Sequence, residues 1–206
     1  MDNPLDRLTQ YFIDFPGIGR RQAKRFAYHI LRQHEGKIAD FLQSMREARS
    51  RIRQCPISFQ YFFEDGSGET CSPIERDTRR DATKLLIVEK DADIESIEKT
   101  KLFNGHYFVL GGLAPLLNTD IDKHLRMQEL IRRVQKFSEK PLQEIIMAFP
   151  ANPEGDRTVH IIREKLTDIL PSSTTLTELG RGMSTGSEIE YIDSKTLEEA
   201  LKNRHS

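Results

Sequence analysis

Acidic residues that follow two apolar stretches are the side chains of this chain best placed to do chemistry. Leu85–Val88 is an unbroken run of four apolar residues, typical of a strand buried on both faces of a parallel sheet, and Glu89 follows it directly. A second apolar stretch, residues 144–149, leads to Glu154 and Asp156. Because the carboxyl ends of parallel strands meet at one edge of a sheet, where such folds bind ligands, we expect these carboxylates to gather there.

Three carboxylates at one sheet edge would have two chemical uses. They could hold a hard cation such as Mg²⁺, with Glu89, Glu154 and Asp156 as candidate ligands, or they could contact a basic partner protein. In the first case Glu89 could also serve as a general acid or base. A solvated acidic loop is the third interpretation, since more acids follow Glu89, namely Asp91, Asp93 and Glu95.

A second candidate site is basic and lies near the start of the chain. Apolar residues at helical spacing predict helices over residues 4–14 and 20–34, joined by the sequence FPGIG. Its glycines, Gly17 and Gly19, permit a tight turn whose free N–H groups can bind a phosphate at the start of the second helix. Four cations begin that helix: Arg20, Arg21, Lys24 and Arg25.

This pattern predicts a helix-hairpin-helix that binds nucleic acid through its phosphates, without reading base sequence. A plain pair of helices with a solvated basic face is the alternative. A third amphipathic helix is expected over residues 38–54, with a basic run of Arg46, Arg49, Arg51 and Arg53. That run could extend the phosphate-binding track or form a solvated helix face.

Charge is spread unevenly along the 206 residues. Residues 1–53 contain 11 Lys and Arg against 6 Asp and Glu, a net charge of +5, whereas the whole chain carries −1. A basic amino-terminal part on an acidic body indicates a polyanion partner at that end. No apolar stretch approaches the length of a membrane span, and the first residues lack the features of a signal peptide. We therefore expect a cytoplasmic chain with no membrane partner.

The only two cysteines, Cys55 and Cys71, flank a short aromatic segment. Apolar residues alternate over residues 57–63, and a turn is expected at residues 64–68, so the segment predicts a β-hairpin. A four-cysteine zinc site would use four positions, which here are Cys55, Ser58, Cys71 and Ile74. Two thiolates do not hold a structural zinc, so we expect a metal-free knuckle packed by aromatic residues. An oxidisable cysteine pair is the alternative.

Strands and helices are expected to alternate from about residue 83 onward, which predicts a parallel sheet with right-handed crossovers. The expected strands are residues 84–89, 106–110, 144–149 and 174–179. The expected helices are residues 93–101, 122–137, 155–169 and 194–203. Between the last strand and the last helix we expect a flexible loop at Gly180, Gly182 and Gly186, and a short strand after residue 188.

Five stretches in the same order resemble the family of bacterial recombination mediators named RecR, over about residues 5–204. They are FPGIGRRQAKRFAYHIL, LLIVEKDADIESIEKT, GHYFVLGGLAP, ANPEGDRTVHII and GRGMSTGSEIEYIDSKTLEEALKNR. The resemblance implies an α+β chain of several parts. These are a helix-hairpin-helix region (1–54), a degenerate zinc-finger-like knuckle (55–76), a Toprim domain with a mostly parallel sheet (77–177) and a carboxy-terminal segment with a glycine loop and a helix (178–206).

The resemblance also implies a function. RecR-like proteins are not enzymes; they form homodimers or homotetrameric rings, bind single-stranded or duplex DNA junctions, and act with RecO- and RecF-type repair proteins to load recombinase on gapped single strands. Arg21 and Arg25 match the basic positions tied to DNA binding. The acidic Toprim positions, tied to the RecO-type partner, correspond to Glu89, Glu154 and Asp156, with Asp93 nearby. A nucleoid-associated location follows from the same resemblance.

The alternative function is a Mg²⁺-dependent Toprim enzyme, such as a nuclease, a primase or a topoisomerase. Topoisomerases resemble much longer chains with a separate domain for a nucleophilic Tyr, and primases need a larger catalytic body. Only about 120 residues follow the basic part and the knuckle here. The sequence therefore favours the DNA-binding mediator.

Overall fold

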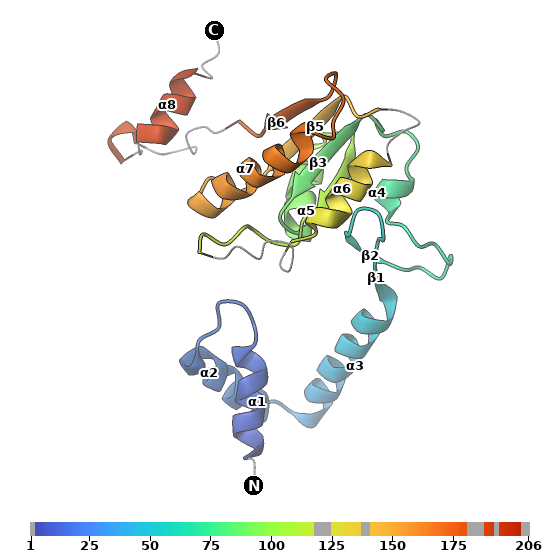
Figure 1. The fold of residues 1–206 in the computed structure, drawn as a ribbon. Coiled ribbons are helices and arrows are strands. Elements are labelled where there is room, and N and C mark those ends of the chain that lie inside the picture. Colours follow the sequence, from blue (N-terminus) through green and yellow to red (C-terminus); the bar gives the residue numbers. More distant parts are fainter. Residues whose placement is uncertain (1–2, 118–124, 137–140, 181–187, 192–193, 203–206) are drawn as a thin grey trace. The chain divides into compact units, whose positions relative to one another are not determined.

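The computed structural model describes residues 3–117, 125–136, 141–180, 188–191 and 194–202 (Figure 1). The chain divides into two compact units, Met1–Ile52 and Arg53–Ser206. No helix among the described residues is long and apolar enough to cross a membrane.

The first unit contains three helices: α1 (Pro4–Ile13), α2 (Arg20–Leu31) and α3 (Glu35–Arg51). Asn3 caps α1, because its side chain accepts the N–H of Leu5 at 3.1 Å. α1 and α2 pack against each other through small and aromatic residues, with Ala23 and Ala27 fully buried. The expected helical hairpin is therefore present.

α3 lies where a helix is expected, but residues 52–54 of that prediction form a short strand instead, and the helix has no buried face. None of its residues is buried, and its apolar side chains Phe41, Leu42 and Met45 are 45–49% exposed. The amphipathic pattern that predicts this helix thus corresponds to an exposed apolar stripe in the first unit.

The second unit is built on a four-stranded parallel sheet, as expected from the unbroken apolar runs. The strands are β3 (Lys84–Val88), β4 (His106–Val109), β5 (Glu144–Ala148) and β6 (Thr175–Glu178), in the order β4-β3-β5-β6. Their carboxyl ends lie level, since Val88 is opposite both Val109 and Ala148.

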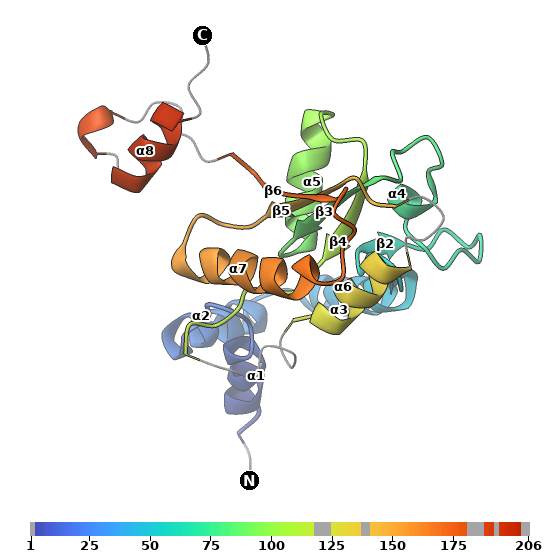
Figure 2. The same ribbon diagram turned by 45° about the horizontal axis from the view of Figure 1, so that its top comes forward.

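Helices cover both faces of this sheet (Figure 2). α5 (Asp91–Thr100) packs on one face, against a core that includes Leu86, Val88 and Tyr107. α6 (Met127–Gln135) and α7 (Pro153–Thr167) pack on the other, against a core that includes Leu85 and Ile87. Successive residues of β3 therefore enter opposite cores, as a strand's two-residue period requires.

The hairpin near the cysteines differs from the prediction. Its strands are β1 (Ile52–Gln54) and β2 (Tyr61–Phe63), so the turn lies at residues 55–60 and not at 64–68. The Cys55 carbonyl accepts the N–H of Phe59 at 2.9 Å, and the Cys55 N–H donates to the Gln60 carbonyl at 2.9 Å. Phe59 closes this turn with a φ of +60°, a conformation that its type does not signal.

The remaining differences lie in the connections. A short helix, α4 (Pro73–Arg76), ends the expected knuckle segment and is capped by Ser72. Near the carboxyl end, the expected strand is instead a 3₁₀ turn, η2 (Ile189–Tyr191), followed by α8 (Ser194–Lys202). Ile189 and Tyr191 are 65% and 80% exposed and pair with no strand among the described residues. The expected loop positions Gly182 and Gly186, and residues 122–124 of an expected helix, lie outside the described residues.

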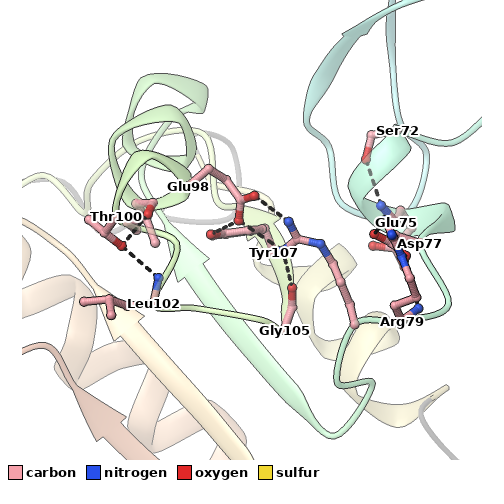
Figure 3. Close-up of polar contacts among 11 residues, drawn as sticks. Ser72, Glu75, Asp77, Arg79, Glu98, Thr100, Leu102, Gly105 and Tyr107 are labelled. Atoms are coloured by element: carbon pink, nitrogen blue, oxygen red, sulfur yellow. Dashed lines mark hydrogen bonds and ion pairs between the residues drawn. The ribbon is translucent and has the colours of Figure 1, made fainter.

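Arg80 joins the segment before β3 to the sheet and to α5. Its guanidinium donates to both carboxylate oxygens of Glu98 and to the Gly105 carbonyl, and the Tyr107 hydroxyl donates to Glu98 at 2.6 Å (Figure 3). Burial raises the pKa of Glu98, but the hydrogen bonds from Arg80 and Tyr107 outweigh it and hold the pKa below its usual value.

Glu98→Gln should remove this charged contact and lower the free energy of unfolding by about 1–3 kcal/mol at neutral pH. A carboxyl group whose pKa is lower in the folded state than in the unfolded state stabilises the fold at pH values above its unfolded-state pKa of about 4.3. This stabilisation is lost as the pH falls through the folded-state pKa. In urea unfolding at several pH values, the gap between wild type and variant should therefore narrow below about pH 4.3. Glu95→Gln, at an exposed position of α5, is the control. A pH-independent gap would contradict this account.

Gly155 has no room for a side chain. It lies in the first turn of α7, where the Asn152 side chain caps its N–H at 2.8 Å, and an added Cβ would lie 1.9 Å from the Pro150 carbonyl oxygen. Gly155→Ala should therefore lower the free energy of unfolding by about 1–3 kcal/mol. Gly180→Ala is the matched control, because nothing lies within 4 Å of a Cβ there. Equal urea midpoints for the two variants would show that the start of α7 shifts enough to accommodate the added methyl group.

Candidate nucleic-acid interface and acidic edge of the sheet

The turn between α1 and α2 presents the start of a helix without a side-chain cap. Gly17 adopts a φ of +74°, and the Ile18 N–H donates to the Phe15 carbonyl at 3.2 Å. Gly19 then occupies the cap position of α2, so no side chain accepts the first N–H groups of that helix. Unsatisfied N–H groups and the positive end of the helix dipole together favour an anion at this point.

Four exposed cations surround this helix start. Arg20 and Lys24 lie one turn apart on α2, and Arg21 and Arg25 form the neighbouring row. All four residues are exposed. The predicted cations and the predicted glycines are thus brought together in one place.

These cations are not used by the fold. Arg25 donates to the Gln22 side chain at 3.3 Å, and among the described residues no carboxylate lies within 4.0 Å of the four cationic groups. A phosphate can approach them without displacing an internal partner. The arrangement can therefore bind a phosphate by N–H groups and by charge-assisted hydrogen bonds together.

The arginines of α3 and its end are exposed as well. Arg46 and Arg49 lie on α3, and Arg53 approaches Glu64 at 3.7 Å. Whether this run extends a phosphate track or is a solvated face stays a prediction, because both interpretations require exposure.

The predicted acids do share one edge of the sheet. β3 and β5 are neighbours in the sheet, so Glu89 and residues 149–156 follow adjacent strand ends. α5 and α7 both begin at this edge, which adds the acids of their first turns. Glu89 is half-buried with its carboxylate 4.0 Å from Lys90 Nζ, while Glu154 is exposed.

Some of these acids have local structural roles. Asp93 caps α5 by accepting the Lys90 N–H at 3.0 Å, and Asp91 accepts the Tyr61 N–H at 2.7 Å from the β1–β2 hairpin. The described residues contain no group of three acids, histidines or cysteines arranged to hold a metal. Glu89, Glu154 and Asp156 thus share an edge without forming the ligand trio that the sequence suggested.

The cysteine knuckle keeps a compact shape around Cys55. Cys55 is fully buried, Ser58 is buried and donates its N–H to the Cys55 sulfur at 3.5 Å, and Cys71 and Ile74 are half-buried. Burial raises the pKa of Cys55, but hydrogen bonds, chiefly from Ser58, leave it below its ordinary value. Burial and the neighbouring Cys55 thiol raise the pKa of Cys71. Two thiols beside a hydroxyl and an isoleucine do not make a tetrahedral zinc site.

Sequence reasoning missed a buried polar group behind the knuckle. Glu75, near the end of the knuckle segment, lies 2.5 Å from Arg133 of α6 and 3.6 Å from His106 of β4. These residues are 27–58 positions apart, and no local pattern links them. A charged residue in an otherwise apolar helix stripe, as at Arg133, is the one signal that could have indicated a buried partner.

Comparison with known families assigns each region. Residues 5–49 match the family model described as RecR, helix-hairpin-helix, residues 83–175 match the Toprim domain, and residues 182–205 match RecR, C-terminal.

Relatives match almost the entire chain. The Recombination protein RecR of Synechococcus sp. (strain JA-3-3Ab) is 36% identical over 201 residues, covering 98% of this chain and 96% of that protein. Those of Psychrobacter cryohalolentis and Rhodospirillum rubrum are 34% and 33% identical, each covering 97% of this chain and 96% of the relative. Together with the helical hairpin and the parallel sheet, these matches show that the chain belongs to the RecR family of recombination proteins.

Proposed function

We propose that this protein is a DNA-binding mediator of recombinational repair that acts without catalytic turnover. It acts with RecO- and RecF-type partners to help load recombinase on gapped single-stranded DNA, as a homodimer or a ring-like homotetramer. The uncapped start of α2, with Arg20, Arg21, Lys24 and Arg25 exposed around it, is the observation that carries DNA binding. Phosphate contacts of this kind do not read bases, which suits a protein that must act at any gap.

The acidic edge of the sheet is the proposed contact for a basic partner protein. Glu89 follows the end of β3, Asp93 lies in the first turn of α5, and Glu154 and Asp156 lie in the first turn of α7, which follows the neighbouring strand β5. Complementary charge at such a contact speeds association and selects the partner more than it adds affinity.

Arg21→Glu with Arg25→Glu should weaken DNA binding at least about tenfold at low salt, because two phosphate contacts are lost. The slope of log affinity against log salt should flatten by about 0.7–0.9 per lost contact. Fluorescence anisotropy with labelled gapped DNA measures both. Lys99→Glu with Lys101→Glu reverses as many exposed charges outside the helical hairpin and serves as the control. Equal losses in both variants would mean that net charge alone, and not this site, binds DNA.

A gel separates the mediator from a Mg²⁺-dependent enzyme. Labelled gapped DNA is incubated with the protein and Mg²⁺, then run on native and denaturing gels. A salt-sensitive native shift with intact strands supports the mediator. Shortened or extended strands would instead assign Glu89, Glu154 and Asp156 to an active site.

The knuckle should fold without zinc, because only Cys55 and Cys71 of its four positions can ligate the metal. Elemental analysis of the purified protein should find far less than one zinc per chain. Ser58→Cys with Ile74→Cys places a thiol at each of the four positions and should gain about one zinc per chain. One zinc per wild-type chain would show that other ligands complete the site.

A further inference from the structure

A cleft of about 1030 Å³ lies in the second unit, at the edge of the sheet where the strands begin. Its lining comes from α6, from residues between 75 and 83 at α4 and the start of β3, and from Pro56 and Ile57 in the turn of the knuckle. Its volume is at the upper end of the range of small-molecule sites. The cleft is separate from the acidic edge, because Thr83 and His106 mark the amino ends of β3 and β4.

Part of the cleft lining consists of buried polar groups. Glu75, His106 and Arg133 line the cleft, and their side chains are only 9–11% exposed. Among the described residues, neither Glu75 Oε2 nor His106 Nδ1 has a hydrogen-bond partner, and their separation of 3.6 Å is too long for one. Buried polar atoms in native proteins nearly always have a hydrogen-bond partner, so buried polar atoms that line a cleft without one point to a ligand.

Cations also line the cleft. Arg132 and Lys136 lie one turn apart at the end of α6. Arg76 lies at the end of α4, where it donates to the Cys71 carbonyl at 3.2 Å and lies 3.3 Å from the exposed Glu69. Arg132 is 67% exposed and its nearest carboxylate, Glu129, lies 3.8 Å away, so the contact is loose. These cations can contact an anionic group that enters the cleft.

Carboxylates line the same cleft. Asp77 is fixed by two contacts of 2.8 Å from Arg79 (Figure 3), which hold its pKa well below the usual range. Asp81, which accepts hydrogen bonds from Thr83, and Glu129 add further acceptors. Carboxylate oxygens accept hydrogen bonds, so these acids suit a ligand that carries hydroxyl or amino groups.

We propose that this cleft binds a nucleotide. Its phosphates contact Arg76, Arg132 and Lys136, its sugar hydroxyls donate to the carboxylates, and its base lies against Pro56, Ile57 and Ala82. The lining thus offers cations, carboxylates and apolar groups, one kind for each part of such a ligand. Neither phosphate alone nor an apolar molecule alone would use all of them. The site does not depend on the proposed DNA contact at α2.

The test is the anisotropy of a fluorescent ATP analogue titrated with the full chain. Saturable binding is expected, with competition by unlabelled ATP and weaker competition by pyrophosphate or adenosine. Arg132→Glu with Lys136→Glu should weaken binding at least about tenfold, and the milder Arg132→Gln with Lys136→Gln should weaken it less. Arg21→Glu with Arg25→Glu, the variant of the DNA site, should bind the analogue like the wild type.

Three results would overturn the proposal. One is no binding up to about 1 mM protein. Another is binding that the Arg132 and Lys136 variants leave unchanged while their circular dichroism matches the wild type. The third is loss of DNA binding in these variants without any nucleotide binding, which would make the cleft part of a strand track. The controls Lys99→Glu and Lys101→Glu exclude a non-specific effect of charge.

Discussion

The burial of β3 on both faces is the constraint on which the second unit depends. Leu85 to Val88 are all 0–2% exposed, and alternate residues enter two different cores. A strand buried in this way needs hydrogen-bonded neighbours on both sides and helices above and below. Parallel pairing with β4 and β5 supplies the hydrogen-bonded neighbours. The covering helices are α5 on one face and α6 and α7 on the other. The same arrangement gives the sheet two chemically different edges, one with acids and one with the cleft.

The helical hairpin and the parallel sheet could be predicted because each depends on a local pattern. Four unbroken apolar residues before Glu89 indicate a buried strand, and FPGIG between two apolar-striped segments indicates a turn between helices. The hairpin turn could not be placed from the sequence, because it depends on Phe59 adopting a positive φ. Glycine is the residue type that adopts positive φ most readily, so Gly66 and Gly68 indicate a turn at residues 64–68 instead. Strand order places Glu89, Glu154 and Asp156 at one edge, but side-chain orientation decides whether they converge, and the described residues form no such metal-holding group. The possible Mg²⁺ site at these acids therefore stays a prediction.

The knuckle shows how a turn can be held without a metal. The Val109 N–H donates to the Ser58 carbonyl at 2.8 Å, which ties the turn to the end of β4. Phe59 packs edge-on against Phe108 at 5.5 Å, and the Arg126 guanidinium lies 5.1 Å above its ring. These contacts fix the turn from the sheet side, where a zinc would fix it from within. Phe59 thus links the hairpin to the main core, and its strained φ is maintained by this packing.

The acids of the sheet edge have structural and proposed partner-binding roles that overlap at single residues. Asp93 supplies a helix cap and Asp91 holds the hairpin through the Tyr61 N–H, whereas Glu89 and Glu154 have no comparable backbone contact by their carboxylates among the described residues. Changing Asp93 to Ala would remove a cap and a charge together, so a lost partner contact could reflect either. Asn at the same position keeps an oxygen that accepts the Lys90 N–H and removes only the charge. The charge of this edge can therefore be separated from its role in folding only by substitutions that preserve the acceptor.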